Sequence, residues 1–170
     1  MRSRIILYII LIFTFVTTQV TLLNFVKIFG VTPNIVIILI VSISLLEGRI
    51  HGATVGFFTG LCLDAVVGIA LGFQALLGML LGLALGNINK RFFKENIFVM
   101  ATCTFISTIL FESTITFAYY LYGIEMEFFI TLKTIILPEA LINSVLGLVL
   151  FLVIVQVNRK ILSYEGKKRY

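Results

Sequence analysis

The chain has 170 residues, of which 60% are hydrophobic and only 12% are charged, and its mean hydropathy is +1.14. Values this apolar exclude an ordinary soluble domain and predict an integral membrane protein. The net charge of +5 would indicate an acidic partner for a soluble protein, but in a membrane protein the positions of the cations matter more than their sum. No nucleic-acid partner is therefore expected.

Apolar runs divide the chain into six predicted transmembrane helices, since about 20 helical residues cross a bilayer. In chain order the predicted spans are residues 5–25, 34–46, 50–67, 73–88, 97–122 and 134–157. The first run is longer than the apolar part of a signal peptide and lacks a small-residue cleavage site, so we interpret it as an uncleaved helix. The second is short and follows Pro33, whose missing N–H does no harm at a helix start. Residues 1–170 are thus expected to form one all-α membrane domain.

The cations predict the orientation of these helices. Six spans place both termini on the same side of the membrane. If that side is the cytoplasm, only Lys27 and Lys133 of the 13 Lys and Arg residues lie outside, and the other 11 lie inside. This distribution satisfies the positive-inside rule. We therefore expect a multi-pass membrane protein with both termini in the cytoplasm.

Glycines recur at intervals of four residues in the third and fourth predicted helices. Because four residues turn an α-helix by about 400°, such glycines lie about 40° apart and form a strip without side chains. In lipid, strips of small residues are the usual means of close contact between helices. The glycines expected to pack helices are Gly48, Gly52, Gly56, Gly60, Gly78, Gly82 and Gly86.

Five polar residues fall inside or at the outer ends of the predicted spans. At about 1.5 Å per residue, Asp64 lies roughly 20 Å and Glu112 roughly 22 Å from the inner end of its helix. Gln74, Glu139 and Asn143 belong to the same outer layer. Buried ionisable groups in membranes mark functional sites by default, which favours a polar pocket or a partner contact. Alternatively, these groups bond neighbouring helices, and Glu139 in addition stabilises the positive end of a helix dipole.

The sequence carries no pattern typical of an enzyme. It has neither a nucleophile with a neighbouring base nor a paired-carboxylate motif, and one histidine with two scattered cysteines forms no metal site of familiar spacing. The glycine run is not a nucleotide loop, because no Gly-Lys-Ser or Gly-Lys-Thr follows it. No catalytic residue, cofactor or metal ligand is therefore predicted.

Several of these features together resemble the family of rod shape-determining proteins MreD. They are Pro33 before a short second helix, the turn Leu46-Glu47-Gly48, the run Gly-Phe-x-x-Gly-Leu-x-x-Asp from Gly56 to Asp64, and a fourth helix that ends on Gly82 and Gly86. The motifs cover residues 33–86, and the hydropathy plan agrees over the whole chain. One departure is Asn34, where the family often has an acidic residue.

The resemblance implies a protein of the bacterial inner membrane that is a non-enzymatic scaffold or regulator of cell elongation and determines cell shape through peptidoglycan synthesis. The implied partners are a bitopic MreC-like protein, membrane lipid and, indirectly, an MreB-like filament and a complex of RodA with a transpeptidase. The implied fold is similar to the six-helix substrate-binding subunits of energy-coupling-factor transporters. A small-molecule-binding subunit of such a transporter is therefore the alternative function. Those subunits dock through Ala-x-x-x-Ala in their first helix, whereas residues 5–25 contain neither alanine nor glycine, which favours the scaffold.

Overall fold

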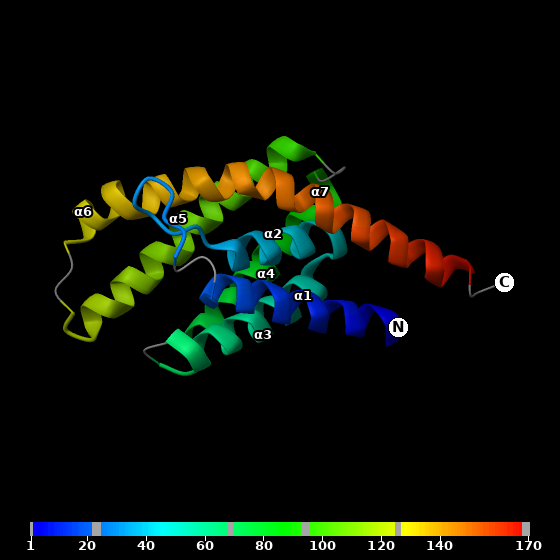
Figure 1. The fold of residues 1–170 in the computed structure, drawn as a ribbon, viewed down its shortest axis with the longest axis horizontal. Helices are drawn as coiled ribbons and strands as arrows, with labels where there is room; N and C mark the ends of the chain where they lie inside the picture. The colour runs from blue at the N-terminus through cyan, green and yellow to red at the C-terminus, as the bar shows by residue number, and fades with distance from the viewer. Residues whose placement is uncertain (1, 22–24, 68–69, 93–95, 125–126, 168–170) are drawn as a thin grey trace.

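The computed structural model describes residues 2–21, 25–67, 70–92, 96–124 and 127–167, and Figure 1 shows that they form a bundle of helices. The elements are α1 (Arg2–Thr21), α2 (Ile35–Glu47), α3 (Arg49–Val67), α4 (Phe73–Phe92), α5 (Ile97–Leu121), α6 (Phe128–Thr131), the π-helical η1 (Leu132–Ile136) and α7 (Leu137–Lys167). The last three elements follow one another without a break, so the described residues form six helical segments. The prediction of an all-helical protein is confirmed.

Two helices in the described part of the chain are long and apolar enough to cross a membrane, namely Ile97–Leu121 and Phe128–Arg159. Three shorter apolar helices accompany them, at Ile6–Thr21, Ile35–Glu47 and Phe73–Ile88. A helix such as α2, with 13 residues, rises only about 20 Å at 1.5 Å per residue. It is therefore shorter than the hydrocarbon core of a bilayer, which is about 30 Å thick.

The short α2 lies in the middle of the bundle. Every side chain from Ile35 to Leu45 is buried, and α2 packs against α1, α3, α4, α5 and α7. A helix that is apolar on all sides is expected to be buried on all sides. Because its neighbours cover it completely, α2 does not need to match the thickness of the lipid.

Backbone contact joins α3 to α4, which form an antiparallel pair. A methyl group added at Gly56 would overlap the carbonyl group of Gly78, and one added at Gly60 would overlap the carbonyl group of Gln74. Further along the pair, Gly82 lies against the backbone of Gly52, and the backbones of Gly86 and Arg49 are in contact in the same way. Gly52 also approaches Ser44 of α2. Glycines from both helices therefore allow the backbones to touch along several turns.

Gly48 differs from these six glycines. Its φ is +88°, and no atom lies within 4 Å of the point where a Cβ would be. It separates α2 from α3, and its N–H donates to the carbonyl of Ser44 at 3.0 Å. A left-handed conformation at the end of a helix favours glycine over all other residues. Gly48 thus makes the turn between two helices, and its backbone also lies close to Gly86 of α4, so its part in helix packing stays a prediction.

Several helix boundaries differ from the prediction, and the largest difference is the end of α7 at Lys167 instead of residue 157. The first helix ends at Thr21 instead of residue 25, and the last helical segment begins at Phe128 instead of residue 134. Pro138 lies inside this segment, two residues after the end of the wide turn of η1. A proline in a helix leaves one carbonyl without a donor and crowds the preceding turn. A π-helical turn is a usual way to accommodate such a disturbance.

Candidate functional site

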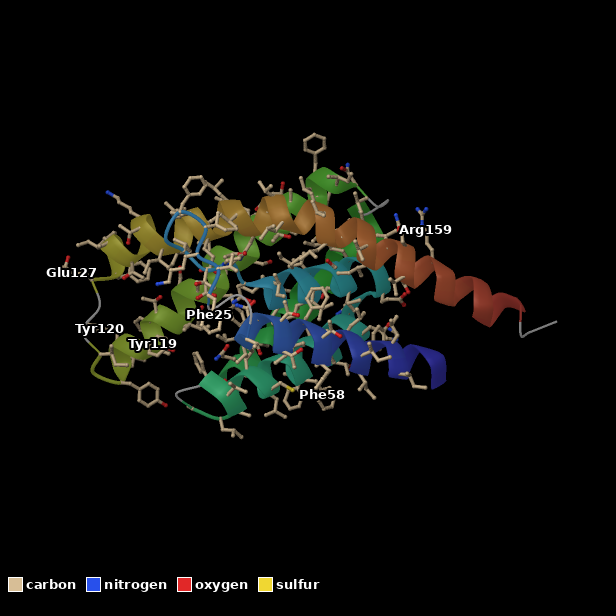
Figure 2. All side chains as sticks on the ribbon, viewed as in Figure 1. Phe25, Phe58, Tyr119, Tyr120, Glu127 and Arg159 are labelled. Atoms are coloured by element: carbon tan, nitrogen blue, oxygen red, sulfur yellow. The ribbon has the colours of Figure 1, made fainter. Side chains whose placement is uncertain are left out.

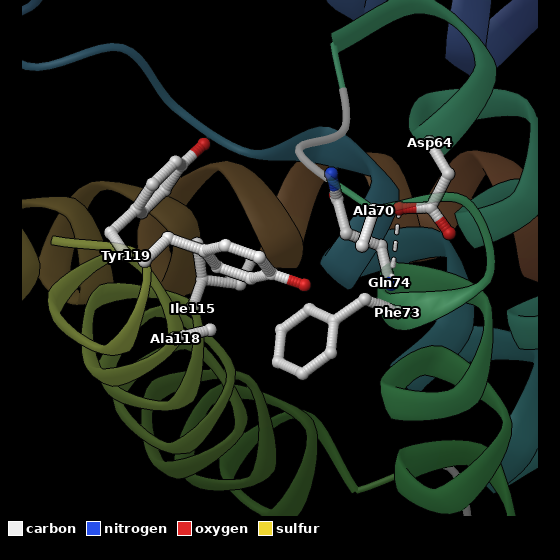
Figure 3. Close-up of a pocket in the computed structure, with 8 residues that line it drawn as sticks. Asp64, Ala70, Phe73, Gln74, Ile115, Ala118 and Tyr119 are labelled. Carbon is white, nitrogen blue, oxygen red and sulfur yellow. Dashed lines mark hydrogen bonds between the residues drawn. The ribbon is translucent and has the colours of Figure 1, made fainter. Parts of the chain in front are cut away.

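Asp64 lies in the last turn of α3, and its carboxylate faces the start of α4 (Figure 3). Oδ2 accepts hydrogen bonds from the N–H groups of Gly72 at 2.9 Å and Ala75 at 3.1 Å. Oδ1 accepts one from the N–H of Gln74 at 3.1 Å. The first N–H groups of a helix have no partner within the helix, and its dipole favours a negative charge there. The Asp64 carboxylate therefore caps α4.

A small hollow lies beside this cap, between the start of α4 and the last turns of α5. Figure 3 shows Phe73 and Gln74 of α4 on one side of it and Tyr119 of α5 on the other. Its volume is about 20 Å³, which is room for about one water molecule. Sites for small molecules usually enclose several hundred Å³. The size of this hollow therefore does not support the transporter-subunit alternative.

A second polar cluster surrounds Asn34, the residue before α2. The Nδ2 of Asn34 donates to Oε1 of Glu112 at 3.0 Å, and its backbone N–H donates to Oδ1 of Asn143 at 2.9 Å. The Nδ2 of Asn143 donates to Oγ1 of Thr108 at 3.2 Å and to Oε1 of Glu139 at 3.4 Å. This cluster therefore connects the start of α2 to α5 and α7.

Gln19 of α1 completes the second cluster. Its Oε1 accepts from the N–H of Ile35 at 2.8 Å, and its Nε2 donates to the carbonyl of Pro33 at 3.1 Å. The Oδ1 of Asn34 accepts from the N–H of Ile37 at 3.4 Å. Buried backbone groups must find partners because no water reaches them. Side chains from α1 and α7 thus satisfy the start of a helix that ends inside the protein.

The structure distributes the five predicted polar residues over these two clusters. Asp64 and Gln74 belong to the cap of α4, whereas Glu112, Glu139 and Asn143 belong to the Asn34 cluster. Asn34 and Gln19 also belong to the Asn34 cluster, although neither is among the predicted site residues. An asparagine after a proline and before an apolar run is a recognisable helix cap. The role of Gln19, by contrast, depends on a contact with a separate segment.

The chemistry of both clusters is that of hydrogen bonding between helices. Every buried side-chain nitrogen and oxygen in the described residues has a hydrogen-bond partner. Within the same residues, no three His, Cys, Asp or Glu side chains lie close enough together to hold a metal ion. The polar groups therefore connect α3 to α4 and, separately, the start of α2 to α1, α5 and α7.

Comparison with known proteins adds one finding. The model of the family described as rod shape-determining protein MreD matches residues 1–161 of the chain. No curated protein and no solved structure matches the chain.

Proposed function

The chain belongs to the family of rod shape-determining proteins MreD, and from this membership we propose that it is a non-enzymatic scaffold of the bacterial cell-elongation machinery. The family match, which covers residues 1–161, is the observation that carries the proposal. A scaffold requires a stable shape, and the described helices have one because their backbone contacts and polar clusters hold them together. The proposed partner is a bitopic MreC-like protein. An MreB-like filament and a RodA and transpeptidase complex would be reached through it.

We place the protein in the inner membrane with six spans and both termini in the cytoplasm. Two observations support this topology. The 11 cations assigned to the inner side outnumber the two on the outer side, as the positive-inside rule requires. In Figure 1, α1 begins and α7 ends at the same end of the bundle, opposite the end of α5 and the start of α6.

Cysteine labelling in intact cells tests this topology. On a background with Cys62→Ala and Cys103→Ala, a cysteine at Glu127 should react with a membrane-impermeant maleimide added from outside. A cysteine at Asn96 should react only after the membrane is permeabilised, because it precedes α5 on the inner side. Both residues lie outside the helices they flank, so access to the reagent decides the result. Reaction at Asn96 in intact cells would exclude six spans with cytoplasmic termini.

Complementation tests the function. In the bacterium that the chain comes from, deletion of its gene should produce rounded cells, and expression of the chain from a plasmid should restore rods. The MreC-like protein should then co-purify with the tagged chain. Ala65→Leu is the matched positive control, since Ala65 lies on an exposed face of α3. If deletion of the gene leaves the cells rod-shaped, the proposed function is wrong. It is also wrong if the plasmid-borne chain reaches the membrane in normal amounts but does not restore rods.

A further inference from the structure

The small hollow beside the cap of α4 is lined by aromatic rings. Phe73 lines it from the start of α4, and Tyr119 and Tyr122 line it from the end of α5. Figure 2 labels Tyr119 at the end of the bundle opposite Arg159, and Figure 3 shows the ring of Phe73 beside the hollow. The faces of aromatic rings carry partial negative charge and attract cations. The rings therefore favour a positively charged occupant.

The carboxylate of Asp64 adds a full negative charge to this lining. The side chain is 5% exposed and lines the hollow. A carboxylate has about four acceptor positions, and three are used by the N–H groups of Gly72, Gln74 and Ala75. These donors are backbone groups, which carry only partial positive charges. A cationic donor in the hollow would use the fourth position and complement the charge.

The size of the hollow restricts the kind of cation. Its volume of about 20 Å³ holds about one water molecule. A primary ammonium group is similar in size to water and has three N–H donors, as in lysine. A trimethylammonium group, such as that of choline, is much larger and has no donor. The hollow therefore fits a primary ammonium and excludes its trimethylated form.

The hollow reaches the level of the outer lipid headgroups in the proposed topology. At 1.5 Å per residue, Asp64 lies about 22 Å along α3 from Arg49, and Tyr122 lies about 38 Å from Ile97 at the start of α5. The outer surface of a hydrocarbon core about 30 Å thick falls between these two levels. An occupant can therefore enter from the headgroup region and have the Asp64 carboxylate beneath it.

Exposed apolar side chains border the hollow. Val66, Leu71 and Leu121 are each more than half exposed, and each lies within two residues of a side chain that lines the hollow. At the outer surface of a membrane such side chains contact acyl chains. The surroundings therefore suit a lipid that brings its own ammonium group better than a lysine on a hydrophilic segment of another protein.

We propose that the hollow between α4 and α5 binds the primary ammonium group of phosphatidylethanolamine in the outer leaflet. Asp64 accepts a hydrogen bond from the ammonium, and Phe73, Tyr119 and Tyr122 surround it. The proposal goes beyond the proposed function and takes from it only the placement in the membrane. Lipid binding is measured on purified protein, so its failure and a failure of complementation are distinguishable.

Fluorescence quenching tests this site, because the chain contains no tryptophan. Leu121→Trp places a single reporter beside the hollow without changing its lining. Phe98→Trp is the matched control at the other end of α5, where Phe98 is 83% exposed. Each protein is reconstituted in phosphatidylcholine vesicles that contain a minor fraction of brominated phosphatidylethanolamine, phosphatidylcholine or phosphatidylglycerol. The reporter at position 121 should show a preference of roughly fivefold or more for phosphatidylethanolamine, and the reporter at position 98 should show none.

The first two brominated lipids have the same net charge, so their difference reports the ammonium group itself. Equal quenching by both at position 121 would mean that only water fills the hollow and would overturn the proposal. A preference for phosphatidylglycerol would overturn it too, because an anionic headgroup is repelled by Asp64. An equal preference for phosphatidylethanolamine at positions 121 and 98 would show a general property of the membrane and would also contradict the site.

Two variants of the Leu121→Trp protein alter the hollow and leave the Asp64 cap in place. Ala70→Leu fills the hollow, since Ala70 lines it and is only partly buried. Tyr119→Leu together with Tyr122→Leu removes two of the rings. In both variants the preference for phosphatidylethanolamine should fall to about that of the control position. Size-exclusion chromatography and the melting temperature identify the folded variants, and a folded variant of either kind that retains the preference would overturn the proposal.

Discussion

Replacement of Gly56 by leucine should separate α3 from α4 and sharply reduce the yield of folded protein. A side chain at this position would overlap the carbonyl group of Gly78, and the same change at Gly60 would overlap that of Gln74. Overpacking typically costs about 1 to 3 kcal/mol, and more when the neighbours cannot move. Because the neighbours here are backbone atoms of a helix, we expect about 3 kcal/mol or more. The melting temperature and the monodisperse fraction in detergent measure the effect.

Two alanines on the same helices provide matched controls for this experiment. Ala65 of α3 and Ala84 of α4 are both exposed, so leucine at either position meets lipid instead of a backbone. Ala65→Leu and Ala84→Leu should therefore retain the melting temperature of the unchanged protein. An unaltered melting temperature for Gly56→Leu would contradict the close approach of α3 and α4.

Replacement of Asp64 by asparagine should also destabilise the protein, although the side chain keeps its shape. The carboxylate accepts three backbone hydrogen bonds, two at Oδ2 and one at Oδ1. An amide has one oxygen, and its NH₂ group is a donor that would face a backbone donor. Each N–H left without a partner costs about 1 to 3 kcal/mol, and the favourable charge at the start of α4 is lost as well. We expect a lower melting temperature and less protein in the membrane.

Gln74→Met is the matched control for Asp64→Asn. Gln74 lines the same hollow, and its contact with Asp64 uses the backbone N–H, which methionine retains. Gln74→Met should therefore leave stability and cell shape nearly unchanged. Asp64→Asn could instead have a normal melting temperature while the cells become round and the MreC-like protein no longer co-purifies. That result would mean that a partner recognises the charge of Asp64 and that capping of α4 does not explain its role. Normal melting together with normal rods would contradict a requirement for the carboxylate in either role.

The amino-acid sequence by itself determined the class of the protein and its family. Hydrophobic runs and the positions of cations are local properties of a chain, and they indicate a membrane protein without knowledge of its folded form. The four-residue glycine interval is local too, because it follows from the pitch of an α-helix. A motif such as Gly56 to Asp64 is likewise readable without coordinates, and the family match over residues 1–161 confirms the family that it indicated.

Only the tertiary structure decided which polar groups meet. Asn34 and Asn143 are 109 residues apart in the chain but 2.9 Å apart as donor and acceptor, and no periodicity of the sequence predicts that contact. The same holds for Asp64, whose depth could be counted but whose three partners lie in and just before the first turn of the next helix. Depth along a helix follows from a constant rise per residue, whereas a partner depends on how the helices are placed around α2. Hydrogen bonds need that placement, because they form only over about 3 Å between groups that face each other.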